Sequence, residues 1–388
     1  MFTDSFLEAN GVGTVSQQLA RFARARERPF ACVYAGEQTQ ARREGSVSHF
    51  ELKRSPASFP LDKNLTCDLL LNRYKNRMVR QLGEFRPDLV HITGPGDVGV
   101  LGFWVAHCLR VPLVASWHTN LHEYAGRRLE KLFGFAPREW RQGLAGAAER
   151  GSLDACLRFY RLARFTMAPN ADMVELLRAS TGKPSYLMAH GVDTERFTPA
   201  RRTREGGPFR IGYVGRLTPE KNVRALVELE SGLIASGARD FLVLAVGDGG
   251  EREWLKAHLR FGDLPGALHG DQLADTFANM DAFVFPSRTD TFGLVMLEAM
   301  ASGVPVIARP ETAARVGIAD GVNGVASADF TLEVRALMDN EPMRRDMGCA
   351  ARRFACTHAW DGVFDQLYEI YAAGLGRDGS SSPLPSVL

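Results

Sequence analysis

Phe209-Arg-Ile-Gly-Tyr-Val-Gly-Arg-Leu-Thr-Pro-Glu-Lys-Asn222 is the stretch of sequence that decides the fold. It opens with an apolar run that contains β-branched and aromatic residues, which predicts a buried strand. Gly215 then ends the strand tightly, and Pro219 suits the first turn of a helix. A strand that passes through a glycine turn into a helix is the repeating unit of a doubly wound α/β domain.

The same alternation of short apolar strands and helical patterns runs through most of the chain. The expected strands form two series: 30–35, 89–93 and 113–117, and then 209–215, 241–246, 282–286 and 304–308. Helical periodicity is clear in segments such as 72–83 and 99–110. Between the two series, residues 199–208 have the polar, Pro- and Gly-rich composition of a linker. We therefore expect two doubly wound domains joined near 190–208, with ligands bound outside the carboxyl ends of the strands.

Both ends of the chain are unusual. Met1-Phe-Thr-Asp-Ser-Phe-Leu7 begins where a first strand should already be ending, so either this strand is very short or the true start lies upstream. The tail at 377–388 is low in complexity, and we expect it to be disordered.

The composition excludes several classes of protein. The chain has 388 residues, 45% of them hydrophobic and 24% charged, which is ordinary for a soluble globular protein. Its six cysteines form no C-x-x-C pair, and no histidine lies at metal-ligand spacing, so reduced cytosolic thiols are expected and a structural zinc site is not. A signal peptide and an apolar stretch of membrane-spanning length are both absent, which predicts a chain that does not cross a bilayer.

The net charge of +2 hides an asymmetry between the two halves. Residues 1–200 contain 27 Lys+Arg and 20 Asp+Glu, a balance of +7, so the remaining 20 basic and 25 acidic residues give −5. The basic residues cluster at 73–77, 127–131 and 158–164. One interpretation is a solvated helical face. The other is a first domain that binds anionic lipid, where each basic residue near the surface contributes about 1 kcal/mol.

Two carboxylates stand out in the segment 286–305. Asp290 precedes a Phe-Gly turn, and Glu298 lies eight positions further on, in an otherwise apolar run expected to be helical. An ionised side chain in such surroundings needs a partner. The hydroxyl groups of a ribose or a hexose are suitable partners, because a carboxylate can accept two hydrogen bonds at once.

Several glycine-rich turns are candidate phosphate sites. After Gly215, the cations Arg216 and Lys221 lie five residues apart at an expected helix start, which suits a diphosphate; the alternative is a surface Arg and Lys beside a turn. Gly11 and Gly13 precede an expected helix at 15–26, where adjacent amides could form an anion cradle. Gly247 and Gly249 follow another strand in the same way, although helix packing alone also selects glycine there.

These motifs resemble the family 4 retaining glycosyltransferases. Residues 286–305 match the E-x7-E region of that family, with Asp290 in place of the first Glu. This resemblance covers nearly the whole chain and is strongest over 211–305. It implies the α/β fold called GT-B, in which two doubly wound Rossmann-like domains face a central cleft. The domains would be 1–189 with a C-terminal crossover helix at 358–376, and 190–357.

The resemblance also implies roles for individual residues. Arg216 and Lys221 would hold the diphosphate of a nucleotide sugar, and Glu298 would bind the ribose. Asp290 and the amides around 292–294 would bind the sugar. The remaining expected donor-binding positions are Gly11, Gly13, Gly215, Gly247, Gly249, His269, Phe292, Gly293 and Leu294.

His118 follows an apolar strand in Ser-Trp-His-Thr-Asn-Leu-His-Glu-Tyr124. A lone histidine is more often structural than catalytic. Its strand-end position and the resemblance favour a role in hydrogen bonding to the transferring sugar.

The implied function is transfer of a hexose from a GDP- or UDP-sugar to a hydroxyl acceptor with retention, without a metal or other cofactor. The sequences of these motifs are most similar to those of lipid-directed mannosyl, glucosyl and sulfoquinovosyl transferases. We therefore expect a lipid or glycan acceptor, no nucleic-acid partner, and a cytoplasmic protein that can bind the inner membrane face. The alternatives are a transferase for a soluble polysaccharide, a nucleotide-sugar epimerase, and a non-catalytic GT-B binding subunit.

Overall fold

The computed structural model describes residues 1–8, 10–62, 65–118, 138–288, 290 and 293–376. The chain divides into two compact units. One comprises Met1–Ala189 together with Phe364–Leu388, and the other comprises His190–Val363.

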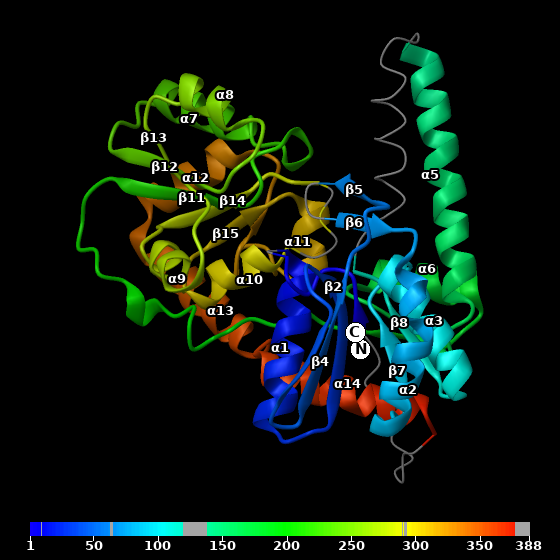
Figure 1. Cartoon of the computed structure of the whole chain (residues 1–388). Helices are drawn as coiled ribbons and strands as arrows, with labels where there is room; N and C mark the ends of the chain where they lie inside the picture. Colours follow the sequence, from blue (N-terminus) through cyan, green and yellow to red (C-terminus); the bar gives the residue numbers. More distant parts are fainter. Residues whose placement is uncertain (9, 63–64, 119–137, 289, 291–292, 377–388) are drawn as a thin grey trace. The chain divides into compact units, whose positions relative to one another are not determined.

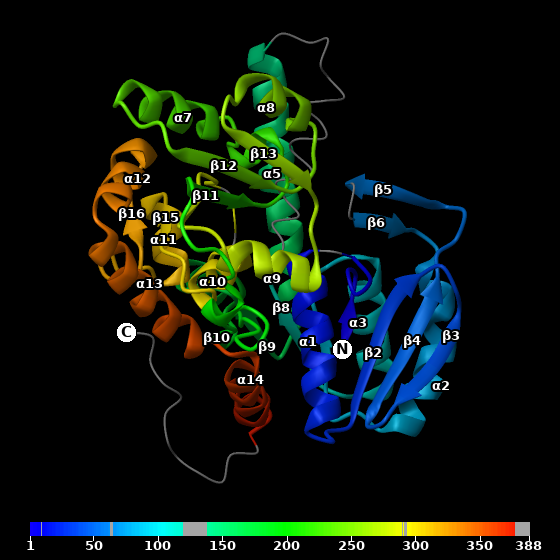
Figure 2. The ribbon, with the colours of Figure 1, turned by 90° about the vertical axis from the view of Figure 1, so that its left-hand side faces the viewer.

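The first unit is built on a sheet whose strands are parallel except at one edge (Figures 1 and 2). In spatial order the strands are β10 Ser185–Leu187, β9 Phe165–Ala168, β8 Leu113–Ser116, β7 Val90–Ile92, β1 Phe2–Thr3, β2 Phe30–Gly36, β4 Val47–Lys53 and the antiparallel β3 Gln40–Glu44. A separate hairpin pairs β5 Ser58–Asp62 with β6 Leu65–Asp68. The chain order reverses direction across the sheet between β1 and β7, which is the position where doubly wound sheets bind ligands.

Helices cover both faces of this sheet (Figure 1). They are α1 Gly11–Ala25 and α14 Trp360–Gly374 on one face, and η1 Leu71–Tyr74, α2 Lys75–Phe85, α3 Asp97–Leu109, α5 Arg138–Tyr160 and α6 Ala171–Thr181 on the other. Phe22 of α1 packs against Phe364 of α14 with ring centroids 5.5 Å apart. Burial of such large apolar side chains is the main favourable term that holds the layers together.

The second unit has an all-parallel sheet with helices on both faces (Figure 1). Its strands, in spatial order, are β13 Gly262–Gly266, β12 Phe241–Val246, β11 Phe209–Val214, β14 Ala282–Phe285, β15 Val306–Ala308 and β16 Val325–Ala326. Its helices are η2 Pro199–Arg201, η3 Pro219–Lys221, α7 Ala225–Ala235, α8 Arg252–His258, α9 Gly270–Ala278, α10 Leu294–Ala301, α11 Pro310–Val316, α12 Phe330–Asp339 and α13 Glu341–Cys356. Here the order reverses between β11 and β14.

The structure contains every strand expected from the sequence, with ends that differ by two residues at most. Three expectations need correction. The first helix begins at Gly11, not at residue 15, because the side chain of Asn10 accepts a hydrogen bond from the Gly13 amide and caps the helix there. The helix expected at Pro219 is only the short turn η3, and α7 begins at Ala225.

The third correction concerns residues 199–208, whose composition is typical of a free linker. This segment is attached to the second unit by arginine–carboxylate pairs. Arg202 and Arg204 both bind Asp281, at 2.6 and 2.7 Å, and Arg201 binds Asp275 at 2.8 Å. Asp281 also accepts from the amide of Arg210 at the start of β11, so the segment is tied to the sheet itself.

Candidate active site

The expected diphosphate and sugar residues of the second unit meet where its strand order reverses. The loop after β11 carries Lys221, and the loop after the neighbouring β14 carries Asp290. Their side chains form an ion pair between Lys221 Nζ and Asp290 Oδ1, although 69 residues separate them in sequence. Both side chains are mostly buried, with 16% and 18% of their surface exposed. A cation and a carboxylate are therefore held together at the usual ligand position of a doubly wound sheet.

One oxygen of Asp290 is left over from this pair. Its Oδ2 is buried and has no hydrogen-bond partner among the residues that the structure describes. The Oγ of Ser287 is also fully buried and has no hydrogen-bond partner among the described residues. Buried polar atoms normally find partners, so each exception needs an explanation. Two such atoms within four residues of each other are candidates for binding a polar ligand.

The backbone of Asp290 is fixed from a neighbouring helix. Arg315 of α11 donates from Nη1 to the Asp290 carbonyl oxygen at 2.9 Å. The second expected cation, Arg216, forms an ion pair with Glu220 at 3.5 Å and is 38% exposed in its side chain. Tyr213 donates to the Arg216 carbonyl oxygen at 2.9 Å, and burial together with the nearby Asp290 charge raises the pKa of this phenol. Tyr213 is therefore a neutral donor that holds the backbone of the loop after β11.

Glycines allow the two phosphate-loop candidates to pack backbone against backbone. Gly247 has φ 141° and Gly249 has φ 157°. A Cβ at Gly247 would overlap the carbonyl oxygen of Gly215, and a Cβ at Gly249 would overlap that of Leu217. The Leu217 amide donates to the Asp248 carbonyl oxygen at 2.9 Å across the same contact. These glycines are thus required by packing, whatever they do toward a ligand.

Glu298 lies in the middle of α10. Burial, and secondarily the charge of Asp193, raise the pKa of its carboxyl to about 8. At neutral pH the carboxyl is therefore mainly protonated. A half-buried carboxyl with a pKa raised in this way is a candidate for binding hydroxyl donors.

The other predicted positions of the second unit have simpler surroundings. Gly293 has φ 80° and precedes Leu294, the first residue of α10. His269 is exposed and immediately precedes α9, where its side chain makes no capping hydrogen bond. Phe292 lies outside the described residues.

In the first unit, the two predicted glycines lie in the opening turn of α1. The amide of Gly13 donates to Asn10 Oδ1 at 2.9 Å. A Cβ on Gly13 would overlap the carbonyl oxygens of Ser5 and Glu8, so close packing requires this glycine. Gly11 is exposed at the first helical position. Any role of the two glycines toward an anion stays a prediction.

His118 follows β8 and is buried. Its Nε2 lies 2.8 Å from Ser116 Oγ, which is in turn 2.7 Å from His91 Nε2 on the neighbouring strand β7. Burial lowers the pKa of His118 to about 4, so the imidazole is neutral at physiological pH. A neutral imidazole can donate a hydrogen bond to a sugar hydroxyl without adding a charge.

In each unit, several residues beside the candidate groups gave no local signal in the sequence. They are His91, Ser116, Asp193, Tyr213, Ser287 and Arg315. Asp193 belongs to the turn Gly191-Val-Asp193. The others are brought to these groups by neighbouring strands or helices, and a single sequence does not give that order.

The described residues contain neither a candidate metal site nor a candidate membrane-spanning helix. Among the described residues, no group of three or more His, Cys, Asp or Glu side chains is arranged to hold a metal ion. Within the same residues, no helix has both the length and the apolar character needed to cross a membrane.

Comparison with known proteins gives matches along the chain. The family model described as "Glycosyltransferase Family 4" matches residues 9–196, and that described as "Glycosyl transferases group 1" matches residues 195–354. A GDP-mannose-dependent alpha-mannosyltransferase of Mycobacterium tuberculosis is 34% identical over 312 residues, which cover 78% of this chain and 77% of that protein. A sulfoquinovosyl transferase of Arabidopsis thaliana is 29% identical over 330 residues, which cover 77% of this chain and 59% of that protein.

Among solved structures, that of HepE from Anabaena in complex with UDP and glucose matches with a TM-score of 0.66. The identity is 17%, and the match covers 96% of this chain and 98% of that one. At this identity the likeness shows the fold alone. It confirms the predicted class, α/β with two doubly wound domains of the GT-B type.

Proposed function

The chain belongs to the family 4 glycosyltransferases, and on this premise we propose that it transfers a hexose, most simply mannose, from a nucleoside diphosphate sugar to a hydroxyl group of a lipid. The relatives named above favour GDP-mannose as the first donor to test. The proposed step breaks the bond between the anomeric carbon and the diphosphate oxygen, and forms a bond from that carbon to the acceptor oxygen, whose proton leaves. Retention at the anomeric carbon is proposed from the family resemblance.

The observation that carries the donor proposal is the Lys221–Asp290 pair at the strand reversal of the second unit. The leaving diphosphate needs positive charge as the bond breaks, and preorganised cations supply it most effectively. Lys221 and Arg216 are the proposed cations. Asp290 would accept a hydroxyl of the transferring sugar at its unpartnered Oδ2. Its side chain is one methylene shorter than the glutamate common in the family, so the donor sugar must lie closer to the backbone.

The remaining roles follow from chemistry at each position. Glu298 would accept two hydrogen bonds from the ribose diol in its ionised form, and His118 would donate one to the transferring sugar. We propose that no divalent metal is needed, since two cationic side chains are available for the diphosphate. Turnover should therefore survive treatment with excess EDTA, and loss of turnover that Mg²⁺ or Mn²⁺ restores would contradict this.

The donor is tested by thermal shift with GDP-mannose, UDP-glucose and ADP-glucose on the full chain. A ligand at 100 times its Kd adds about 2.7 kcal/mol to the free energy of unfolding, which is readily seen as a higher Tm. The stabilising donor is then supplied with a radiolabelled sugar and mixed lipids, and the label is followed into the lipid extract. Absence of any shift and of any donor consumption would overturn the enzyme proposal, and conversion of the donor without transfer would indicate an epimerase.

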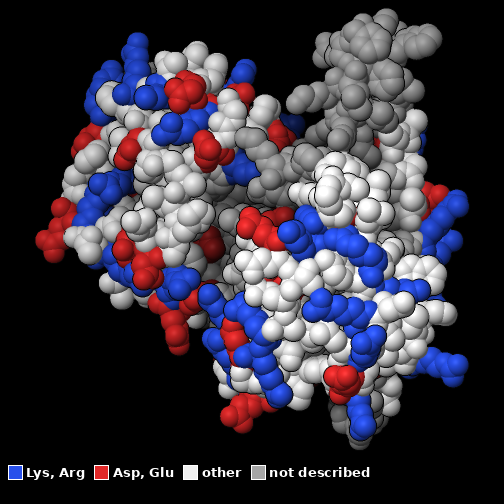
Figure 3. Space-filling model, in the orientation of Figure 1, with Lys and Arg blue, Asp and Glu red and all other residues white. Residues whose placement is uncertain are grey.

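The lipid acceptor is proposed from a surface of the first unit. Leu69 and Leu70, between β6 and η1, are 70% and 54% exposed, and Trp104 of α3 is 41% exposed. Lys75 Nζ lies 5.8 Å from the centroid of the Trp104 indole, and Arg77 is exposed on the same helix as Lys75. Figure 3 shows basic side chains gathered over this part of the first unit. Exposed leucine and tryptophan flanked by cations are typical of a protein that binds the surface of an anionic bilayer.

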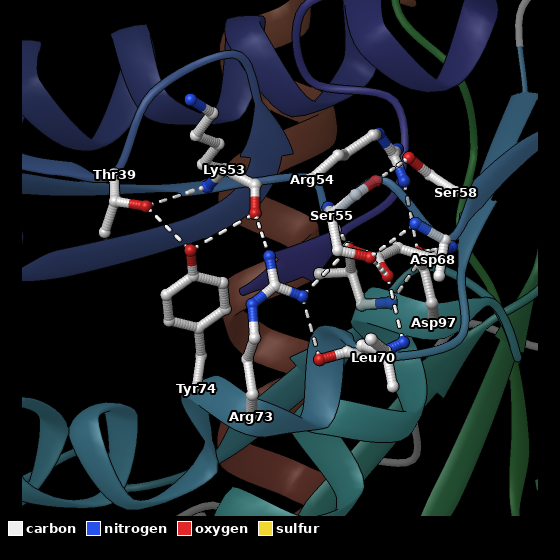
Figure 4. A network of polar contacts seen from close by, with 12 residues as sticks. Thr39, Lys53, Arg54, Ser55, Ser58, Asp68, Leu70, Arg73, Tyr74 and Asp97 are labelled. Carbon is white, nitrogen blue, oxygen red and sulfur yellow. Dashed lines mark hydrogen bonds and ion pairs between the residues drawn. The ribbon is translucent and has the colours of Figure 1, made fainter.

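The turn that carries the two leucines is held rigidly (Figure 4). The carboxylate of Asp68 accepts from the amides of Ser55 and Leu70 at 2.7 and 2.9 Å and from Arg73 at 3.0 Å. Burial acts to raise the pKa of Asp68, but these hydrogen bonds outweigh it and lower that pKa to about 2. Arg73 also donates to the carbonyl oxygen of Lys53. The leucines are thus presented to solvent by a fixed turn.

Vesicle co-sedimentation tests this surface with phosphatidylcholine alone and with phosphatidylcholine mixed with phosphatidylglycerol. We expect stronger binding to the anionic vesicles at low salt, and weaker binding as salt is added. The double variant Leu69→Ser/Leu70→Ser should bind several-fold more weakly at every salt concentration, since it removes apolar surface. Leu332→Ser, at an equally exposed leucine of the second unit, is the matched control. No preference for anionic vesicles would count against a lipid acceptor.

A further inference from the structure

His118 is one end of a line of hydrogen bonds that crosses the first unit. The line begins at Tyr371 of α14, whose hydroxyl is 2.7 Å from His91 Nδ1. His91 Nε2 is 2.7 Å from Ser116 Oγ, and Ser116 Oγ is 2.8 Å from His118 Nε2. The four side chains come from a C-terminal helix, two neighbouring strands and the segment after the second strand.

The middle of this line is buried, and hydrogen bonds hold the backbone at both of its ends. His91 and Ser116 are 2% and 1% exposed. Tyr160 donates to the carbonyl oxygen of Ser116 at 3.1 Å, which fixes the backbone beneath the serine hydroxyl. At the other end, Arg164 donates from Nε to the carbonyl oxygen of Gly374 at 2.8 Å and holds the end of α14 on the first unit. The spacing of the four groups is therefore set by the fold.

The chemistry of the groups gives the line a direction. A neutral phenol is a good hydrogen-bond donor, and His91 Nδ1 is the partner that the structure gives to the Tyr371 hydroxyl. If Nδ1 of His91 accepts, its Nε2 carries the proton and donates to Ser116 Oγ. The serine hydroxyl is then free to donate to Nε2 of His118. His118 therefore keeps its own proton on Nδ1, because the tautomer of an imidazole follows from the hydrogen bond at its other nitrogen.

Burial supports this neutral arrangement. It lowers the pKa of both His118 and His91 and raises that of Tyr371, so none of these groups gains or loses a proton near neutral pH. An alternative direction exists, because Ser116 Oγ also lies 3.5 Å from the carbonyl oxygen of Ile92. Donation to Ile92 would leave His118 protonated on Nε2. The 2.8 Å contact to His118 is much the shorter of the two and favours the first direction.

We propose that Tyr371, His91 and Ser116 are positioning residues that hold His118 as the neutral tautomer protonated on Nδ1, so that this N–H is the donor offered to the transferring sugar. The proposal rests on the function proposed above for His118. It gives the C-terminal helix a part in the reaction that its apolar, core-like sequence does not suggest. A purely structural network would need each polar group to be satisfied, but it would not need one particular tautomer at its end.

The tautomer can be measured directly, without any substrate. We propose ¹⁵N NMR of the full chain labelled at histidine, with His118 assigned by the signals that disappear in His118→Gln. The wild type should show the Nδ1-protonated pattern at neutral pH. Tyr371→Phe removes the first donor, and Ser116→Ala removes the last link, so both should give a mixed or Nε2-protonated His118. Ser116→Thr restores a hydroxyl and should restore the wild-type pattern.

Two control variants separate this effect from loss of a buried hydroxyl in general. Tyr368→Phe alters the neighbouring tyrosine of α14, which packs under Arg28 at 4.1 Å. Ser185→Ala removes a buried hydroxyl that pairs with Thr166 at 2.8 Å in the same sheet. Neither should change the His118 signals. In the transfer assay, Tyr371→Phe and Ser116→Ala should lower kcat on the order of fivefold, the factor of one neutral hydrogen bond, while both controls keep the wild-type kcat.

An Nε2-protonated His118 in the wild type, or an unchanged tautomer in both relay variants, would overturn the proposal. Because the NMR measurement needs no donor, this failure is distinct from failure of the role proposed for His118, which would appear as wild-type transfer by His118→Gln. It is also distinct from failure of the proposed function, which would appear as the absence of any donor consumption.

Discussion

The carboxyl edges of the two sheets carry polar groups of opposite character. In the second unit the groups are ionisable. The Lys221–Asp290 ion pair leaves one carboxylate oxygen without a partner among the described residues, and the pKa of Glu298 is about 8. In the first unit the groups are neutral and joined to one another, from Tyr371 through His91 to His118. The first arrangement is costly until a ligand completes it, whereas the groups of the second are joined to one another by hydrogen bonds within the protein.

The contrast follows from the work proposed for each edge. A leaving diphosphate develops charge, so the groups that stabilise it must be ionised and must accept the cost of partial burial. A group that only directs a sugar hydroxyl needs a fixed direction and no charge. The second unit should therefore respond to substitution mainly in catalysis and in pH-dependent binding. Substitutions in the first unit should instead change the tautomer of His118 and the stability of the protein at acid pH.

The largest effect is expected at the ion pair of the second unit. Lys221→Met removes the cation proposed for the diphosphate, and kcat/KM should fall on the order of 10²- to 10³-fold. Asp290→Ala and Glu298→Ala should each lower transfer by on the order of 10²-fold. Steady-state kinetics with the donor identified by thermal shift measures these values.

Lys256→Met, at an exposed lysine of α8, is the matched control and should keep wild-type kinetics. The double variant Lys221→Met/Asp290→Asn restores charge balance and should recover stability without recovering activity. If the double variant also recovers activity, the pair is structural and the comparison between the two edges fails at its main point.

The next effect is the pH dependence of donor binding at Glu298. With a pKa of about 8 in the ligand-free protein, the carboxyl must lose a proton to accept two ribose hydrogen bonds. The affinity for GDP-mannose should therefore rise about tenfold per pH unit as the pH increases toward 8, and then level off. Calorimetric titration between pH 6 and 9 measures it, and Glu298→Gln should give weaker binding that hardly depends on pH.

The same shift has the opposite sign for stability of the ligand-free protein. The folded state binds the Glu298 proton more tightly than the unfolded state, so the carboxyl destabilises the fold increasingly as pH rises from the unfolded pKa toward 8. Glu298→Gln should accordingly unfold at a higher denaturant concentration than the wild type at pH 7.

The binding prediction has its own contrary outcome. Equal affinity of the wild type for GDP-mannose at pH 6 and pH 8 would show that Glu298 does not bind the donor in its ionised form.

Local signals in the sequence predicted most of the architecture. Strand and helix periodicity located the sheets, and Gly215, Gly247 and Gly249 marked turns that the packing of two loops does require. The start of α1 is also encoded locally, because Asn10 is a preferred capping residue. The linker-like segment at 199–208 was misleading, since its arginines find carboxylates that are distant in sequence.

The site was predicted less completely, and the reason is the order of the strands. The pairing of Lys221 with Asp290 depends on β11 lying beside β14, and no local pattern encodes that neighbour. His91 lies in a short apolar strand, and Tyr371 lies on the apolar face of a helix, so each looks like an ordinary core residue. They gain a chemical role only because the fold places Tyr371 within hydrogen-bond distance of His91, and His91 within that distance of Ser116.

The smallest effect is expected from the buried histidines of the first unit, in the acid stability of the protein. His118 has a pKa of about 4 in the folded state against about 6.5 when unfolded, and burial lowers that of His91 as well. The unfolded state therefore binds more protons as pH falls. The stability that neutral His118 provides is fully present above about pH 6.5 and is lost between there and about pH 4, at up to about 1.4 kcal/mol per pH unit. Urea denaturation at several pH values measures the slope of the unfolding free energy against pH.

His118→Gln should reduce this slope, whereas His258→Gln, at an exposed histidine of α8, should not. An unchanged slope in His118→Gln would mean that this imidazole is not held neutral by the fold, and the contrast between a charged edge and a neutral one would then be lost.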